Sequence, residues 1–190
     1  MAAASGLLAG RVACITGAGS GLGRAIAERF ASEGAIVVAQ DIDAESAQQT
    51  VASLAGDGHL PTVGDVADEQ AMLDVFAAIS DRFGRIDVMV NNAGVGMLNV
   101  LEGAEIAKAR EMFEINVLGA MAMTRAVMPA MRERRTGVIV NISSSVTLRP
   151  LPALSIYTAS KAALNAFTES FALEAKEFGV RARLVLPGSA

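Results

Sequence analysis

Short apolar runs alternate along the whole chain with longer segments of helical periodicity. Six runs have the length of strands, over residues 11–15, 35–39, 60–63, 86–90, 138–142 and 181–186. Five segments between them predict helices, over 22–33, 44–54, 69–83, 104–134 and 155–178, with Pro129 expected to kink or divide the fourth. Strand–helix–strand units of this kind make right-handed crossovers, so the pattern predicts an α/β fold with a parallel sheet covered by helices on both faces.

The composition of the chain restricts its number of domains, its partners and its cellular location. The 190 residues predict a single domain over 1–190, and 52% apolar against 19% charged residues argues against disorder. The net charge of −4 offers no basic surface, so we expect no nucleic-acid partner. No apolar run is long enough for a membrane span, residues 1–9 do not resemble a signal peptide, and the single Cys14 fits a reducing compartment. We therefore expect a cytoplasmic protein with no membrane partner.

A glycine-rich segment, residues 16–23, lies between the first predicted strand and the first predicted helix. Glycines at this place allow a tight turn and a close approach of the backbone to a pyrophosphate, whose charge is favoured by the helix N-terminus. Glycine-rich turns without a ligand are common, but the strand before and the helix after favour phosphate binding. We assign the contacts to Gly17, Ser20, Gly21, Leu22 and Gly23.

The second predicted strand is followed by Asp41, 18 residues after Gly23. An acidic residue at this position accepts hydrogen bonds from the ribose hydroxyls of NAD. A 2′-phosphate would be repelled by this carboxylate, and neither Ser20 nor Ile42 supplies a cation. The sequence therefore predicts NAD rather than NADP, with Asp41 and Ile42 at the ribose. The alternative is that Asp41 only caps the next helix.

Three polar side chains indicate acid–base chemistry near the end of the chain. Tyr157 and Lys161 are four residues apart on a predicted helix and so share one face. An ammonium near a phenol favours the phenolate, which prepares the tyrosine to exchange a proton. Ser144 follows the fifth predicted strand, where its hydroxyl could hydrogen-bond the group that Tyr157 protonates. A tyrosine and a lysine one turn apart are also common without any function.

Together these motifs resemble the short-chain dehydrogenase/reductase family. The resemblance covers nearly the whole chain, in the order of the family. It rests on Thr16-Gly-x-x-x-Gly21-x-Gly23, Asp65-Val66, Asn91-Asn92-Ala93-Gly94, Asn116, Ser144, Tyr157-x-x-x-Lys161 and Pro187-Gly188. It implies a Rossmann-type doubly wound sheet in three layers, and reversible hydride transfer between a nicotinamide cofactor and an alcohol or carbonyl carbon.

The resemblance also implies roles for the catalytic residues. Tyr157 would be the general acid or base, and Ser144 would hold the substrate oxygen. Lys161 would favour the phenolate and contact the nicotinamide ribose. Asn116 would hold a water that links Lys161 to solvent, although an asparagine inside a helix could instead bridge buried backbone groups.

Cofactor contacts follow from the resemblance in the same way. Asp65 and Val66 would border the adenine, although Asp65 could be an ordinary turn residue. The segment after the fourth strand would line the cofactor, although it could be a plain loop. The residues assigned there are Asn91, Asn92, Ala93 and Gly94, with Pro187 and Gly188 farther along the chain.

Members of the family commonly run to about 250 residues, so the usual seventh strand and the segment that closes over substrate are expected to be absent from these 190. This leaves an alternative function, an NAD-binding sensor or scaffold with impaired turnover. The substrate pocket implied by the resemblance is apolar, with Val95, Gly96, Ser145, Val146 and Leu151 as candidates. Family members usually pair through the helices that correspond to 104–134 and 155–178, so a homodimer or homotetramer is expected. The only histidine, His59, is read as structural or surface, and no metal site is predicted.

Overall fold

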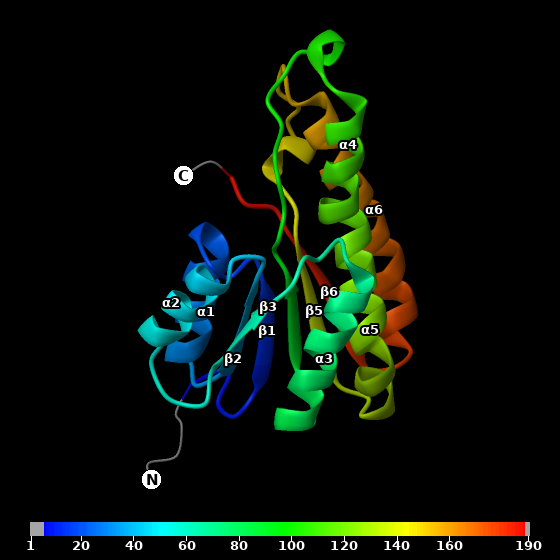
Figure 1. The fold of residues 1–190 in the computed structure, drawn as a ribbon. Helices are drawn as coiled ribbons and strands as arrows, with labels where there is room; N and C mark the ends of the chain where they lie inside the picture. The colour runs from blue at the N-terminus through cyan, green and yellow to red at the C-terminus, as the bar shows by residue number, and fades with distance from the viewer. Residues whose placement is uncertain (1–5, 189–190) are drawn as a thin grey trace.

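A computed structural model describes residues 6–188 of the chain. Six parallel strands form one sheet in the order β3-β2-β1-β4-β5-β6 (Figure 1). This order reverses direction between β1 and β4, which is the point where ligands of doubly wound sheets bind. The strands are β1 (Val12–Thr16), β2 (Ile36–Asp41), β3 (Leu60–Val63), β4 (Val88–Asn91), β5 (Gly137–Ile142) and β6 (Val180–Val185).

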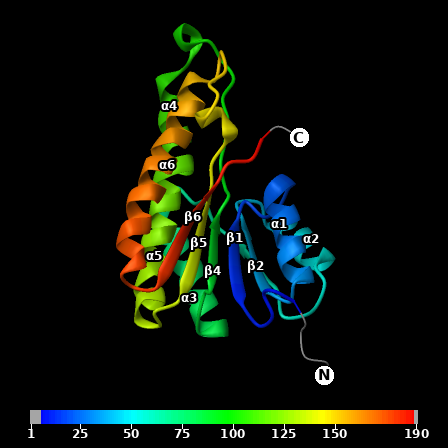
Figure 2. The ribbon, with the colours of Figure 1, turned by 180° about the vertical axis from the view of Figure 1, so that it is seen from behind.

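Helices cover both faces of the sheet, so the predicted three-layer Rossmann-type fold is confirmed. Side chains of α1 and α2 pack on one face, and those of α3, α5 and α6 pack on the other (Figures 1 and 2). The helices are α1 (Gly21–Ser32), α2 (Ala44–Ser53), α3 (Glu69–Phe83), α4 (Ile106–Phe113), α5 (Ala120–Glu133) and α6 (Ser155–Lys176). None of the helices in the described part of the chain has the length and apolarity needed to cross a membrane.

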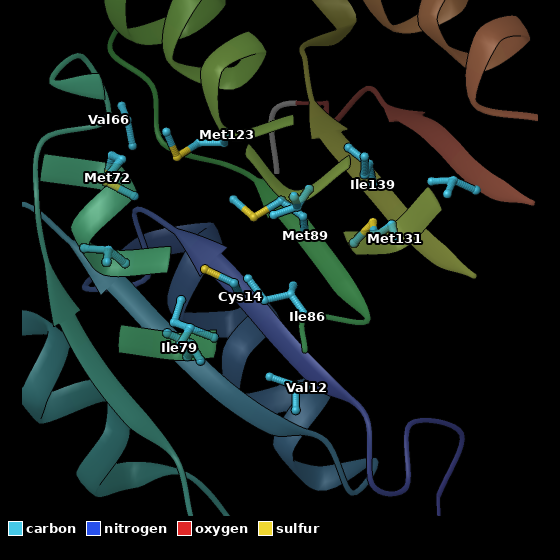
Figure 3. Close-up of a cluster of buried hydrophobic side chains, with 14 of the residues drawn as sticks. Val12, Cys14, Val66, Met72, Ile79, Ile86, Met89, Met123, Met131 and Ile139 are labelled. Atoms are coloured by element: carbon cyan, nitrogen blue, oxygen red, sulfur yellow. The ribbon is translucent and has the colours of Figure 1, made fainter. Parts of the chain in front are cut away.

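The core on the α3, α5 and α6 face is rich in sulfur-containing side chains. Met89 of β4 packs there with Met123 and Met131 of α5 and with Met72 of α3, as Figure 3 shows. Cys14 of β1 lies in the same cluster, fully buried, and burial raises the pKa of its thiol to about 12. The flexible thioethers fill irregular gaps between the helices and the sheet.

The long helix predicted over 104–134 is the main difference from the sequence-based elements. The structure begins α4 at Ile106 and interrupts the regular helix with a π-helical segment, Glu114–Gly119, before α5. Pro129 does not divide the helix, because α5 continues past it to Glu133. Two short 3-10 helices, Leu101–Gly103 and Ser145–Thr147, were not predicted. The other elements begin and end within two residues of their predicted limits.

Candidate active site

Two adjoining cavities lie where the carboxyl ends of β1, β4 and β5 meet. One has a volume of about 570 Å³ and is lined by the glycine-rich turn, Asp41 and Asp65. The other has a volume of about 520 Å³ and is lined by Ser144, Tyr157 and Lys161. Both cavities share Leu22, Asn92, Gly94 and Val95 in their walls. They therefore form one cleft, with the predicted phosphate turn at one end and the predicted proton-transfer residues at the other.

The glycine-rich turn is packed too closely to carry side chains at its key positions. A Cβ at Gly23 would lie 2.0 Å from the Gly17 carbonyl oxygen and 2.6 Å from Asn92 Nδ2. Helix α1 begins at Gly21, and its N-cap Ser20 makes no side-chain capping bond. The first amides of α1 are therefore not covered by a cap, which leaves a helix N-terminus suited to a pyrophosphate at this end of the cleft.

Asp41 holds the turn from the adjacent strand. Its Oδ2 accepts a hydrogen bond of 2.7 Å from the Gly19 amide. The cap of α2 is Asp43, whose Oδ1 accepts from the amides of Glu45 and Ser46 at 2.8 and 3.2 Å. The alternative in which Asp41 only caps the next helix is therefore wrong, because Asp43 fills that position.

A cation does lie near the turn, but it is engaged within the protein. Arg24 donates to the Gly19 carbonyl at 2.6 Å and, through Nε, to the Thr50 hydroxyl at 3.0 Å. Thr50 in turn donates to the Ala18 carbonyl at 2.9 Å. The guanidinium of Arg24 thus fixes the shape of the turn, and it does not line the cleft.

The segment after β4 is joined to the turn through Thr16. Its hydroxyl accepts from the amides of Asn92 and Ala93, both at 3.0 Å, and Asn92 Nδ2 donates back to the Thr16 carbonyl at 2.9 Å. Asn91, which was expected to line the cofactor, is instead buried and donates to Asn141 Oδ1 at 2.8 Å. Successive strand residues point to opposite faces, so Asn92 reaches the cleft and Asn91 cannot.

At the other end of the cleft, α6 carries Tyr157 and Lys161 on one face, as their spacing predicted. The Lys161 nitrogen lies 5.9 Å from the centroid of the Tyr157 ring and donates to the Ile142 carbonyl at 3.0 Å. Lys161 is only 4% exposed, and this burial lowers the pKa of its ammonium from the ordinary 10.5 to about 8. Ser144 lines the same cavity from the end of β5.

Asn116 stands behind this group, within the π-helical segment, and lines neither cavity. Its Oδ1 accepts from the Val95 amide at 2.8 Å, and its Nδ2 donates to the Val95 carbonyl at 2.9 Å. Asn116 therefore does bridge backbone groups, although Val95, to which they belong, is exposed. A Cβ at Gly94 would lie 3.0 Å from Asn116 Oδ1 and 3.2 Å from Lys161 Nζ, which shows how closely the three residues converge.

The remaining predicted site residues also line the cleft. The turn end contains Gly17, Ser20, Gly21, Leu22, Gly23, Ile42, Asp65, Val66 and Ala93, and the other end contains Pro187 and Gly188. The expected pocket residues Val95, Gly96, Ser145, Val146 and Leu151 line the Tyr157 cavity. His59 lies elsewhere: its Nδ1 accepts from the Val37 amide at 3.0 Å, which makes it structural. Within residues 6–188, no three acidic, histidine or cysteine side chains gather as metal ligands.

Sequence reasoning missed several residues that shape the cleft. Ser143, Thr147 and Asn165 form hydrogen bonds with one another beside Ser144. The only signal for these residues in the sequence is their spacing from the motif residues. The contacts themselves join three separate segments of the chain, so they leave no local pattern. The other unpredicted lining residues are Gln40, Gly64, Glu111, Ile115, Ile142 and Leu154.

Comparison with known proteins agrees with this geometry. The family profile for short chain dehydrogenases matches residues 11–190. The chain belongs to the short-chain dehydrogenase family. It is 40% identical over 184 residues to 2-(R)-hydroxypropyl-CoM dehydrogenase of Xanthobacter autotrophicus, covering 94% of this chain and 74% of that enzyme.

Solved structures of the short-chain dehydrogenase family superpose closely on this chain. The crystal structure of NAD+-bound xylitol dehydrogenase matches with a TM-score of 0.91 and 30% identity, over 96% of this chain and 71% of that one. A 3-ketoacyl-(acyl-carrier-protein) reductase from Brucella melitensis, complexed with NADH, matches with a TM-score of 0.92 and 34% identity, over 95% and 76%. The chain is thus a member of an oxidoreductase family with a doubly wound sheet.

Proposed function

We propose that this short-chain dehydrogenase transfers a hydride between NAD(H) and a secondary alcohol or ketone. The observation that carries the proposal is the continuous cleft, which joins a glycine-rich helix N-terminus to the pair Tyr157 and Lys161. Two of the similar solved structures are described as bound to NAD+ or NADH. A bound nicotinamide would supply the hydride acceptor for oxidation, or the hydride donor for reduction.

In the direction of oxidation, the Tyr157 oxygen takes the hydroxyl proton as the carbon loses its hydride. In reduction, the same oxygen returns the proton to the new alkoxide. The Lys161 ammonium lies 5.9 Å from the centroid of the Tyr157 ring and so places a positive charge beside the group that exchanges the proton. Ser144 donates a hydrogen bond to the substrate oxygen, where negative charge develops. Asn116 holds the Val95 backbone, and Val95 lines both cavities of the cleft.

Preference for NAD is proposed from the charges at the turn end of the cleft. Asp41 places a carboxylate there, and its neighbour Ile42 is apolar. The nearby Arg24 is engaged with Gly19 and Thr50 and does not line the cavity, so it would not neutralise a 2′-phosphate. Asp41 would instead accept hydrogen bonds from the two ribose hydroxyls. Asp65 and Val66 line the same end, where we place the adenine.

The substrate is proposed to be apolar around its reacting carbon. Val95, Val146, Leu151 and Leu154 line the Tyr157 cavity, and Lys161 is its only charged lining residue among those described. An anionic group in this cavity would therefore have only a buried ammonium that already donates to the Ile142 carbonyl. A neutral alcohol or ketone with an aliphatic or cyclic body fits these walls.

We also propose that the chain assembles as a homodimer or homotetramer through α5 and α6. A groove of about 310 Å³ runs between these helices, with Met121, Met128, Phe167 and Phe171 among its lining residues. Apolar grooves of this kind mark interaction surfaces. Light scattering after gel filtration would give twice or four times the chain mass, and a monomer would refute this assignment.

The experiment that tests the activity is a spectroscopic assay at 340 nm. Mixing the protein with NAD and a panel of secondary alcohols is expected to produce NADH, and NADP is expected to give much slower reduction. A parallel titration measures NAD binding directly. Binding of NAD without turnover of any alcohol or ketone would favour the alternative of a sensor or scaffold, which the names of the relatives do not support.

A further inference from the structure

Asn165 is a third polar residue on the face of helix α6 that carries Tyr157 and Lys161. Residues 157, 161 and 165 follow one another at intervals of four, so they form one stripe along the helix. Lys161 donates to the Ile142 carbonyl at the end of β5. Asn165 also bonds at this end of the strand, but to side chains. The bonds of Lys161 and Asn165 therefore hold helix α6 against the segment where β5 ends and the turn of Ser144 begins.

The bonds of Asn165 form a directed chain. The buried Ser143 hydroxyl donates to Asn165 Oδ1, and Asn165 Nδ2 donates to the Thr147 hydroxyl at 3.0 Å. Thr147 then donates to the carbonyl oxygen of Ser144 at 2.9 Å. The Ser143 hydroxyl also lies 3.3 Å from the Lys161 carbonyl, a longer contact for its single proton than the one to Asn165. The Asn165 amide and the Thr147 hydroxyl each accept one hydrogen bond and donate another within this chain of bonds.

This chain ends on the backbone of Ser144, which is why it bears on the position of the Ser144 side chain. The Ser144 carbonyl also accepts from the Thr147 amide at 3.2 Å. In contrast, among residues 6–188 the Ser144 hydroxyl has only a long contact of 3.4 Å, from the Val146 amide. The direction of that hydroxyl is therefore set mainly by the backbone of its turn, and not by strong bonds of its own.

We propose that Asn165 is a positioning residue, which fixes the turn bearing Ser144 against the helix bearing Tyr157. Among residues 6–188, no other side chain of α6 hydrogen-bonds to residues 144–147. The inference rests on the proposed function, because it assigns Ser144 and Tyr157 to one reacting oxygen. If the turn that bears Ser144 shifts, the hydroxyls of Ser144 and Tyr157 no longer meet at that oxygen, whereas the dinucleotide end of the cleft is unchanged.

The test compares two substitutions on the same helix. Asn165→Leu keeps the approximate volume and removes the bonds to Ser143 and Thr147. Thr168→Val is the matched control, because the buried Thr168 hydroxyl accepts from Asn141 Nδ2 at 2.8 Å and does not contact the turn. We expect Asn165→Leu to lower kcat by about 10- to 100-fold, as a misplaced reacting group does, with NAD affinity within about twofold of wild type. Thr168→Val is expected to lower the melting temperature but to leave kcat within about twofold.

Thr147 supplies a rescue test of the same chain. Thr147→Val removes the hydroxyl and should lower kcat as Asn165→Leu does, whereas Thr147→Ser retains the hydroxyl and should restore most of it. The double variant Asn165→Leu/Thr147→Val should be no worse than either single variant, because both break one chain. Equal losses of kcat in Asn165→Leu and Thr168→Val, or an unchanged kcat in Asn165→Leu, would overturn the proposal.

An activity-independent measurement separates this inference from the proposed function. Hydrogen exchange of the amides in residues 144–148 should be faster by about tenfold or more in Asn165→Leu, and unchanged there in Thr168→Val. If wild-type protein shows no turnover, the proposed function fails, while faster exchange still supports the role of Asn165 in fixing the turn. Unchanged exchange in Asn165→Leu refutes that role whether or not the protein turns over.

Discussion

Lys161 is the residue whose burial has the most direct consequence for stability. The residue is 4% exposed, and among residues 6–188 its ammonium has one hydrogen-bond acceptor, the Ile142 carbonyl. Burial lowers the pKa of Lys161 from 10.5 to about 8. The unfolded chain keeps the proton of this lysine up to about pH 10.4, whereas the folded protein releases it near pH 8. Between these values the unfolded state holds more protons, so the free energy of unfolding rises with pH.

The substitution that isolates this effect is Lys161→Met, which keeps an unbranched apolar stem and removes the charge. One pKa unit corresponds to about 1.4 kcal/mol, so the shift of Lys161 corresponds to about 3 kcal/mol between pH 7 and pH 10.5. Over that range, the free energy of unfolding of wild type should increase by this amount relative to that of Lys161→Met. Cys14 acts in the opposite direction, because its folded pKa of about 12 makes stability fall as the unfolded thiol ionises. Cys14 is present in both proteins, so its contribution cancels in the difference.

Urea denaturation at closely spaced pH values, without cofactor, measures this difference. The difference in the free energy of unfolding, wild type minus Lys161→Met, should rise from pH 8 and level off near pH 10.5. Parallel pH dependences in the two proteins would show that the Lys161 ammonium is not destabilised by burial, and the reasoning would fail. A difference that falls with pH would instead require the charged form to be favoured in the folded protein.

Three further predictions concern the turn end of the cleft and the structural residue His59. Gly23→Ala places a Cβ 2.0 Å from the Gly17 oxygen, so it should abolish NAD binding in a titration and destabilise the fold by about 1–3 kcal/mol. The control is Gly96→Ala, which has open space around its Cβ and should not change the melting temperature. Equal melting temperatures for both variants would contradict the packing argument. Asp41→Ala should weaken NAD binding by about 10- to 100-fold and reduce the preference over NADP; a wild-type preference for NADP would show this assignment to be wrong. His59→Leu leaves the Val37 amide without its acceptor and should lower the free energy of unfolding by about 1–3 kcal/mol in urea, and an unchanged value would show that water replaces the imidazole.

The sequence predicted most of the fold because its strands and helices have clear periodicity. The run 60–63 and the segment 69–83 coincide with β3 and α3, since apolar spacing and flanking polar residues mark their limits. The interruption at Glu114–Gly119 could not be predicted in this way. Within this segment the Asn116 side chain bonds to the Val95 backbone, a contact between residues 21 positions apart that local periodicity does not reveal.

The site shows the same division between local and long-range information. Tyr157 and Lys161 were paired from their spacing, because four residues on a helix always share a face. The different directions of Asn91 and Asn92 follow from where β4 lies in the sheet, and the roles of Asp41 and Asp43 depend on where α2 begins. Asn165 has no motif of its own, and only the folded chain brings it to Thr147.

Replacement of Tyr157 by phenylalanine tests the central claim most directly. The substitution removes one oxygen from the wall of the cleft and leaves the glycine-rich turn and Asp41 untouched. Turnover of the best secondary alcohol, followed at 340 nm, should fall by about 100- to 10,000-fold, the range that general acid–base catalysis supplies. NAD affinity, measured by titration of the same preparation, should stay within about twofold of wild type. Unchanged turnover in Tyr157→Phe would show that the proton passes through another group and would contradict the account.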